Sequence, residues 1–172
     1  MYLAVFGHCP HHEPKFLPWH RLYSLKMERL LGLPLPYWDF AERGDVPQLW
    51  ASIKPDVPGP ANFDSSMQQE CTGNPNYVIR KQRININADS NKKGMFNAYM
   101  QDDFRKFMNL LDSPHMGMHV EMGCHMQQGQ KYPPYDPMFW LIHSAVDRQF
   151  ALWQVTQFFV LSLACSDQPS NN

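Results

Sequence analysis

The sequence predicts a mainly α-helical protein, built as an antiparallel helix bundle with long irregular loops. The prediction rests on two apolar stripes with spacings of three and four residues, in FLPWHRLYSLKMERLL (16–31) and DPMFWLIHSAVDRQFALWQ (136–154). Pro18 suits the first turn of the earlier helix, and Pro137 that of the later one, behind Asp136 as a candidate N-cap. Each stripe has a histidine, His20 or His143, among its core positions.

A third helical stretch covers about residues 104–111, and Ser113 and Pro114 indicate the cap and first turn of a further helix. That helix, HMGMHVEMG, should stop at Gly123, and it places His115 and His119 on one face. Residues 44–94 are rich in Pro, Asn, Asp and Ser, with only short β-like runs at 77–79 and 84–86. We expect a long ordered loop there.

The chain of 172 residues is long enough for one domain with a real core. Its formal net charge of −1 gives no general electrostatic reason to expect nucleic acid or an anionic membrane as a partner. The opening MYLAVFGHCPHH has no basic region, and its apolar run is too short for a signal-peptide core or a membrane span. No membrane segment is therefore expected. The four cysteines have no CxxC spacing and do not indicate a disulfide scaffold.

All eight histidines fall into two clusters, residues 8–20 and 115–143. In the second cluster, His115 and His119 at i and i+4 can bind one metal ion from one helix, and His143 on a facing helix supplies a third nitrogen. Ligation by nitrogen alone fits copper or zinc better than magnesium, calcium or manganese. The first cluster offers candidate ligands for a second ion: His8, His11, His12 and His20.

Simpler interpretations of these histidines stay open. A histidine on an apolar helix is more often a hydrogen-bonded core residue than a ligand, and the histidines at 8, 11 and 12 also fit a solvated turn. A zinc protease is disfavoured because Met116, not Glu, follows His115, and a zinc deaminase because no PCxxC follows His119. His125 lies beyond the expected helix end and receives no role.

Two long segments resemble the copper motifs of a known family. HHEPKFLPWHRLYSLKMERLL followed by LPYWDF resembles the first copper motif of the type-3 copper proteins, which comprise tyrosinases, catechol oxidases and molluscan haemocyanins. SPHMGMHVEMGCHM followed by YDPMFWLIHSAVDRQFALWQ resembles the second, and the order is that of the family. The resemblance covers about residues 8–40 and 104–154, and agreement of this length is much more specific than a short pattern.

The resemblance implies a tyrosinase-like helix bundle around a dinuclear copper site, in a single domain spanning 1–172. Residues 1–40 would hold the first copper motif, 41–100 the loop region, 101–155 the second copper motif and 156–172 a divergent tail. Three helices of the bundle are then expected in this chain. Such an open bundle is marginally stable and prone to self-associate.

The resemblance also implies roles for individual residues. His11 and His20 would be the second and third ligands of the first copper, with His12 as a neighbour. The three ligands of the second copper would be His115, His119 and His143. Cys9 stands where some members carry a cysteine joined to the histidine by a thioether, and a free thiol is the alternative.

Four further residues are expected around the metals. Phe16 and Phe139 each precede a histidine by four positions, which places their rings near His20 and His143. Asp147 and Arg148 resemble the family's Asp–Arg pair outside the ligands, although a plain ion pair would look the same.

The chain departs from the family pattern before the first copper motif. The family's first ligand of the first copper normally lies on a separate upstream helix, and only ten residues precede His11 here. The chain is therefore expected to be N-terminally incomplete, with His8 as a candidate substitute ligand. Met116 stands where many members have an asparagine thought to position a water that deprotonates a phenol, so catechol oxidation is better supported than monophenol hydroxylation.

The function that the resemblance implies is copper-dependent oxidation of o-diphenols to o-quinones by dioxygen. Two copper ions are expected, or one if the first site is incomplete. The partners would be dioxygen and a small phenolic substrate, and the family suggests a secreted protein or one in an organelle lumen. Haemocyanin-like oxygen binding and a degenerate mononuclear metal protein without catalysis are the alternatives.

Overall fold

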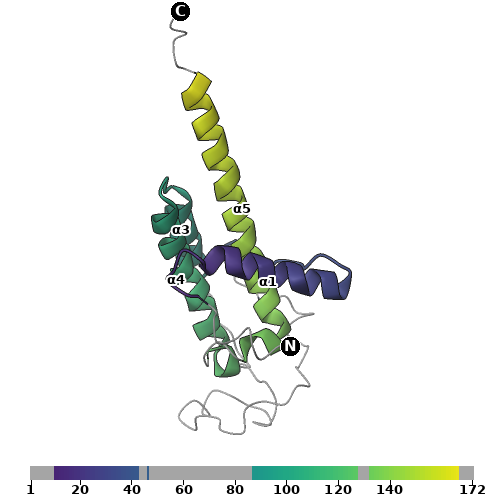
Figure 1. Cartoon of the computed structure of the whole chain (residues 1–172). Coiled ribbons are helices and arrows are strands. Elements are labelled where there is room, and N and C mark those ends of the chain that lie inside the picture. The colour runs from purple at the N-terminus through teal and green to yellow at the C-terminus, as the bar shows by residue number, and fades with distance from the viewer. Residues whose placement is uncertain (1–9, 43–45, 47–86, 128–131, 167–172) are drawn as a thin grey trace, which may run out of the picture.

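The computed structural model describes residues 10–42, 46, 87–127 and 132–166 (Figure 1). Helices make up most of this part of the chain, which contains no strand, and this confirms the mainly α class. None of its helices is both long and apolar enough to cross a membrane. The elements are α1 (Phe16–Leu31), α3 (Ala88–Tyr99), α4 (Phe104–Met122), α5 (Pro137–Ser166) and the short 3-10 helices η3 (Cys124–Met126) and η4 (Pro133–Tyr135).

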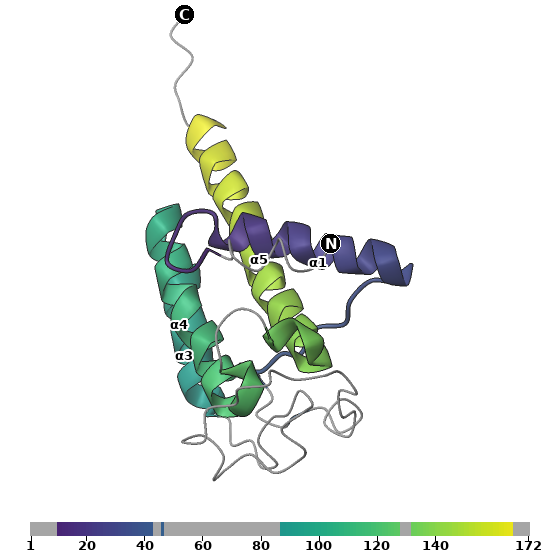
Figure 2. The same ribbon diagram turned by 60° about the horizontal axis from the view of Figure 1, so that its bottom comes forward.

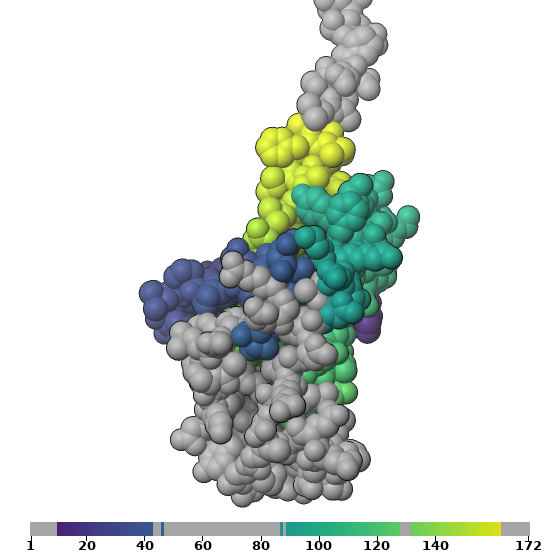
Figure 3. Space-filling view, turned by 180° about the vertical axis from the view of Figure 1, so that it is seen from behind, coloured from purple at the N-terminus to yellow at the C-terminus, as the bar shows by residue number. Residues whose placement is uncertain are grey.

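The helices pack as an antiparallel pair crossed by a third helix. Figures 1 and 2 show α4 and α5 running in opposite directions, with α1 lying across α5 at a steep angle. α3 packs along α4, and α1 packs mainly on α5. From behind, the last turns of α5, in yellow, stand clear of the other described helices (Figure 3).

α1 has the bounds that the sequence predicts. It ends at Gly32, which has the left-handed φ of +68° and whose N–H donates to the carbonyl of Glu28 at 2.8 Å. A residue without a side chain adopts this φ at little cost. The Glu28 carboxylate also accepts a hydrogen bond from the N–H of Leu35 at 2.8 Å. The chain is thereby turned back toward α5, where the N–H of Trp38 bonds to the Leu141 carbonyl at 3.2 Å.

α4 is one continuous helix, so the predicted break at Ser113 and Pro114 is wrong. Asp103 caps its start by accepting from the N–H of Lys106 at 2.8 Å, and Gly123 with φ +62° ends it as expected. Pro114 lies inside the helix, where it removes one backbone hydrogen bond. Its ring packs on Gly94 of α3, with three ring atoms 3.6–3.8 Å from where a Cβ of Gly94 would stand. This contact between helices offsets the local cost.

α3 lies inside the stretch 41–100 that the sequence analysis assigned to a loop, and that assignment is wrong for residues 88–99. Asn87 caps the helix by accepting from the N–H of Ser90 at 2.9 Å. Among its residues 89–99, whose burial is described, only Met95 and Ala98 are buried, so the apolar stripe that identifies a helix in sequence is nearly absent. The β-like runs at 77–79 and 84–86 lie outside the described residues.

The apolar core is built where α4 faces α5. The ring of Phe107 on α4 stacks on Trp153 of α5 with centroids 4.7 Å apart, and the Trp153 indole N–H donates to the Gln101 carbonyl at 2.6 Å. Leu111 and Ile142 are fully buried and belong to the same apolar cluster. The core therefore brings the middle of α4 against the first half of α5, which is the region that carries the histidines.

Candidate metal centre

Three histidine side chains converge between α4 and α5. The Nε2 atom of His115 lies 3.1 Å from that of His119 and 3.3 Å from that of His143, and the third side of the triangle is 3.4 Å. All three side chains are buried. The i, i+4 spacing on α4 gives the first pair, and packing of α5 on α4 supplies the third nitrogen.

The dimensions of this triangle fit a bound metal ion. In a tetrahedral site with metal–nitrogen bonds of about 2.0–2.1 Å, the ligand nitrogens lie roughly 3.3–3.4 Å apart. The observed 3.1–3.4 Å is close to this value. Three protein ligands also leave a fourth position open, as in catalytic rather than structural sites.

Hydrogen bonds on the far side of the rings orient these imidazoles. Nδ1 of His119 donates to the Met126 carbonyl at 3.1 Å, and Nδ1 of His115 to the Asp112 carboxylate at 3.0 Å. Each bond leaves Nε2 without its proton, so two lone pairs face one another at 3.1 Å. A bound cation would relieve that arrangement, which is a second observation in favour of a metal site here.

Burial keeps the site histidines neutral. Loss of hydration lowers the pKa of His119 and His143 well below its usual value, and it lowers the pKa of His115 despite the Asp112 carboxylate beside it. Burial also lowers the pKa of His20 to about 3, helped by the nearby His115. Neutral imidazole is the form that binds metal, so the site is ready for a metal ion near pH 7.

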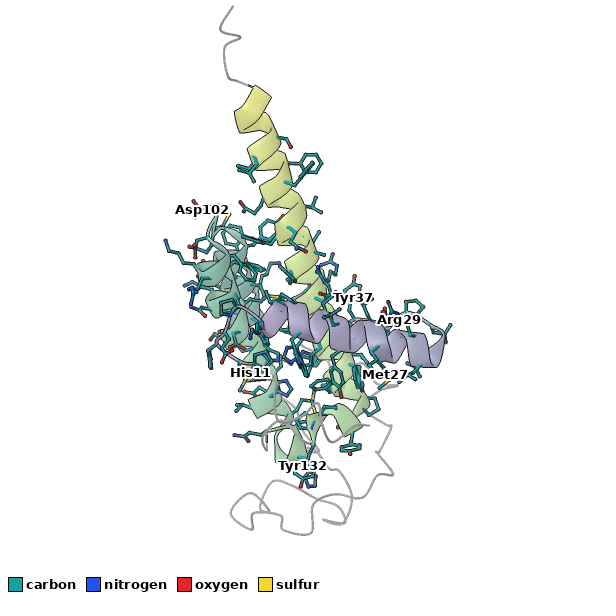
Figure 4. All side chains as sticks on the ribbon, in the orientation of Figure 1. His11, Met27, Arg29, Tyr37, Asp102 and Tyr132 are labelled. Carbon is teal, nitrogen blue, oxygen red and sulfur yellow. The ribbon has the colours of Figure 1, made fainter. Side chains whose placement is uncertain are left out.

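The histidines of the first cluster lie against the triad. The His20 ring stacks on His143 with centroids 4.4 Å apart, and Nδ1 of His20 donates to the Phe16 carbonyl at 2.8 Å. The His11 ring lies 5.5 Å from both His20 and His115. Figure 4 shows the labelled His11 beside α4, near the start of α1. The structure therefore brings together the two histidine clusters that the sequence separates.

The other predicted residues near the first site are placed as follows. His8 and Cys9 lie outside the described residues, so the third ligand of a first copper and the thioether stay predictions. His12 is 74% exposed and has a left-handed φ of +59°. Its Nδ1 lies 2.9 Å from Oδ2 of Asp112.

The flanking aromatic residues lie against the imidazoles. The Phe139 ring is 4.1 Å from the His143 ring, and Phe16 is 4.8 Å from His20. Both phenylalanines are buried. They restrict the rotation of the two histidines, since a buried ring this close leaves little free volume.

Asp147 and Arg148 have different partners. Asp147 accepts from Nε of Arg21 on α1 at 2.5 Å, whereas the Arg148 guanidinium lies 5.0 Å from the centre of the Tyr37 ring. Both lie on the side of α5 that faces α1 rather than in the metal pocket. His125, which received no role, is buried in η3, and its ring lies 5.7 Å from Tyr132.

Asp112 is the site residue that the sequence analysis missed. It is fully buried, and its carboxylate lies within 3.7 Å of Nδ1 atoms of His11, His12 and His115. Burial alone would raise its pKa, but the His11 and His115 imidazoles beside the carboxylate outweigh burial and hold the pKa well below the usual value. An acidic residue three positions before a candidate ligand, inside a buried helix face, is the signal that identifies it.

A cavity of about 290 Å³ opens directly onto these histidines. His11, His20, His119 and His143 form one wall. Met116 and Val120 are 38% and 43% exposed, so they mark the rim. The remaining apolar walls come from Trp19, Pro133, Pro134 and Phe139. The cavity is large enough for a molecule the size of a single aromatic ring and is mostly apolar, as small-molecule sites are.

A family model of the common central domain of tyrosinase matches residues 2–156. Hemocyanin 1 of Megathura crenulata is 32% identical over 173 residues, covering 87% of this chain and 5% of that protein. A tyrosinase of Streptomyces glaucescens is 30% identical, covering 84% of this chain and 64% of its own length. The solved structure of a functional unit from octopus hemocyanin superimposes with a TM-score of 0.68 at 26% identity, covering 88% of this chain and 40% of that unit. The chain thus spans less than two thirds of each of these relatives.

Proposed function

Because the chain belongs to the tyrosinase family of type-3 copper proteins, we propose that it is a copper-dependent oxidoreductase that oxidises o-diphenols to o-quinones with dioxygen. The observation that carries this proposal is the cavity of about 290 Å³ whose wall includes His119 and His143. A substrate ring in this cavity would lie next to the metal ligands. The balanced reaction takes two diphenols and one dioxygen to two quinones and two waters.

The proposed cofactor is copper, with two ions. His115, His119 and His143 would bind the second ion through their Nε2 atoms, and the site's nitrogen donors suit copper. His11 and His20 would bind the first ion, with His8 as its third ligand. Copper bound there would supply the redox chemistry of the reaction, with dioxygen as the oxidant.

The protein side chains bind and orient the substrate. The faces of Trp19 and Phe139 would hold an aromatic ring, since both line the cavity. Pro133 and Pro134 close the wall without adding a donor, and so help to exclude water. Met116 at the rim offers no group that hydrogen-bonds strongly to a water, which favours diphenols over monophenols as substrates.

Two alternatives are supported by particular observations. Oxygen carriage is favoured by the similarity to haemocyanins, one of which is 32% identical over most of this chain. A mononuclear protein is favoured because, in the described part of the chain, His115, His119 and His143 form a group of three histidines, whereas the other group of three possible ligands, His11, Asp112 and His115, shares His115 with it. The oxygen carrier would differ from the enzyme in turnover, and the mononuclear protein would differ from it in the number of metal ions bound.

The test is copper content and catechol oxidation measured on the same copper-reconstituted sample, with the His143→Gln variant as the blank. Two coppers per chain with quinone formation support the proposal. Two coppers with reversible dioxygen binding and no turnover indicate a carrier. One copper without turnover indicates the mononuclear alternative, and zinc retained in preference to copper would contradict both the enzyme and the oxygen carrier.

The setting of the protein is proposed on separate grounds. We propose that the chain forms a single domain, as its length allows. We propose that it is secreted or lies in an organelle lumen, because Cys124 is disulfide-bonded and disulfides persist in oxidising compartments. Self-association is proposed because the last turns of α5 expose large apolar side chains. These are Val155, Phe158, Phe159, Val160 and Leu161, each more than half exposed.

A further inference from the structure

Asp112 touches histidines from both halves of the candidate metal centre. It lies on α4, one turn before His115, and is fully buried. Its Oδ1 is 3.0 Å from Nδ1 of His115 and 3.7 Å from Nδ1 of His11. Its Oδ2 is 2.9 Å from Nδ1 of His12. One carboxylate thus contacts three imidazoles: His115 on α4, and His11 and His12 in the segment before α1.

The burial of this carboxylate needs an explanation. A carboxylate removed from water is strongly unfavourable unless hydrogen-bond donors replace its hydration. In the described part of the chain its ion-pair contacts are all with imidazoles, and neither Lys nor Arg is among them. Nothing about folding α4 requires a charged residue at this position, since Phe107, Met108 and Leu111 on the same helix are buried apolar residues. The carboxylate therefore serves the histidines.

The contact also selects how the rings face. A carboxylate at Nδ1 keeps the proton there and leaves the lone pair on Nε2. The His11 and His115 rings are nearly parallel, 7° apart in plane, with centroids 5.5 Å apart. Since both present Nδ1 to the same carboxylate, both present Nε2 to the opposite side. For His115 that side holds the Nε2 atoms of His119 and His143.

We propose that Asp112 is a positioning residue that aligns the two halves of the metal centre, by orienting His11 and His115 through one shared carboxylate. The proposal rests on the proposed function only in taking both histidines as metal ligands. His12 adds a tie between the loop and α4, because its contact with Oδ2 uses the oxygen that the other two leave free.

The Asp112→Asn variant tests this with little change in shape. The amide removes the negative charge that His11 and His115 share and replaces one of the two acceptor oxygens with a donor NH₂, so it cannot serve those two histidines through one oxygen and His12 through the other. We expect a 10–100-fold loss of metal affinity, the range found when such an outer carboxylate is removed. Asp112→Glu, which restores the carboxylate, should recover part of that loss.

Asp136→Asn is the matched control. Asp136 is also fully buried, and its Oδ1 accepts from the N–H of Met138 at the start of α5, a role that asparagine fills equally well. The readouts are the Kd and stoichiometry for zinc and for copper, by chelator competition without substrate, together with the melting temperature of each metal-free variant. Equal losses of affinity in both variants, or wild-type affinity in Asp112→Asn, would overturn the proposal.

A measurement on the unmodified protein covers the case in which Asp112→Asn does not fold. Nitrogen-15 NMR of the metal-free protein distinguishes the two neutral tautomers of each imidazole. His115 and His11 are expected with the proton on Nδ1, and a proton on Nε2 of either would overturn the proposal. Because neither readout depends on turnover, absence of diphenol oxidation would count against the proposed function and leave this inference standing.

Discussion

The Nε2 atoms of His115 and His143 lie 3.3 Å apart, although the two residues are separated by 28 positions and belong to different helices. His119, on the same helix as His115, completes a triangle in which no side exceeds 3.4 Å. Such a triangle of buried nitrogens has the size of a metal site, and the hydrogen bonds at Nδ1 of His115 and His119 turn their Nε2 lone pairs toward its centre. Metal binding by these three residues is therefore the basis for the first prediction.

Replacing one member of the triad should abolish tight metal binding at this site. We expect His119→Gln to lower the affinity for copper or zinc by at least about 100-fold, because a neutral amide is a poor substitute for an imidazole ligand. His125→Gln is the matched control, since His125 is equally buried but lies off the triangle. Chelator competition measures both variants. Similar losses in the two would mean that the effect comes from folding rather than ligation.

The metal-free protein should lose stability as the pH falls below about 6.5. The folded state holds the pKa of His20 at about 3 and those of the triad below the usual value, so below pH 6.5 the unfolded chain binds more protons than the folded one. The free energy of unfolding should thus be flat above pH 7 and decline from about pH 6.5 toward 3. Each protonating histidine adds up to about 1.4 kcal/mol per pH unit.

Urea unfolding of the metal-free protein at pH 7.5, 6.0 and 5.0 measures this decline. The lowered pKa of Asp112 also lowers the free energy of unfolding as the pH falls, but only near and below the usual pKa of an aspartate, about 3.9. It therefore does not contribute between pH 7.5 and 5.0. A stability that stays constant from pH 7.5 to 5.0 would show that the histidines are solvated rather than buried.

Gly94→Ala should stabilise the protein. Gly94 lies inside α3, where glycine is less favourable than alanine by roughly 0.5–1 kcal/mol. The added Cβ would stand 3.6–3.8 Å from the Pro114 ring, an ordinary van der Waals distance. Thermal unfolding should show a higher midpoint. Gly94→Leu is the contrasting variant, and its larger side chain should push α3 away from α4 and lower the midpoint.

Arg21 should contribute more to stability than Arg148. Arg21 on α1 donates to Asp147 at 2.5 Å and to Gln154 at 2.8 Å, and its guanidinium lies 4.3 Å from the centre of the Phe150 ring. We expect Arg21→Ala to lower the free energy of unfolding by about 1–2 kcal/mol through lost charge-assisted hydrogen bonds. Arg21→Lys should restore less than half of it, since lysine lacks the planar fork.

Arg148→Ala serves as the comparison in the same urea titrations. Its recorded contact with Tyr37, at 5.0 Å, is an exposed cation–π interaction worth roughly 0.5–1 kcal/mol. A larger loss for Arg148→Ala than for Arg21→Ala would contradict the assignment of Arg21 as the link between α1 and α5.

The exposed end of α5 should make the chain self-associate. Phe158 and Phe159 are 68% and 61% exposed on a helix that projects past its neighbours (Figure 3). Replacing both by Glu should lower the average mass in sedimentation at tens of micromolar, because charge opposes burial of this surface. An unchanged, monomeric mass for the unmodified chain would contradict the prediction.

The local features of the fold were predictable from the sequence. The bounds of α1, the stop at Gly123 and the shared face of His115 and His119 all follow from spacing and end signals within a few residues. α3 was not predictable in this way, because it buries little apolar surface. The continuity of α4 through Pro114 was also missed, since it depends on a contact with Gly94 of another helix.

What the sequence determined by itself is which residues can ligate a metal, because residue type and helical period are local properties of the chain. What only the tertiary structure decided is which of them meet. His143 reaches the α4 pair only because α5 packs antiparallel to α4, and His20 stacks on His143 only because α1 crosses α5. The role of Asp112 was likewise decided by the tertiary structure, since no spacing in the sequence indicates that its carboxylate lies between α4 and the segment before α1. Burial of apolar faces is non-directional, so it does not by itself fix the relative orientation of the helices. The side-chain contacts that fix this orientation exist only once the helices have docked.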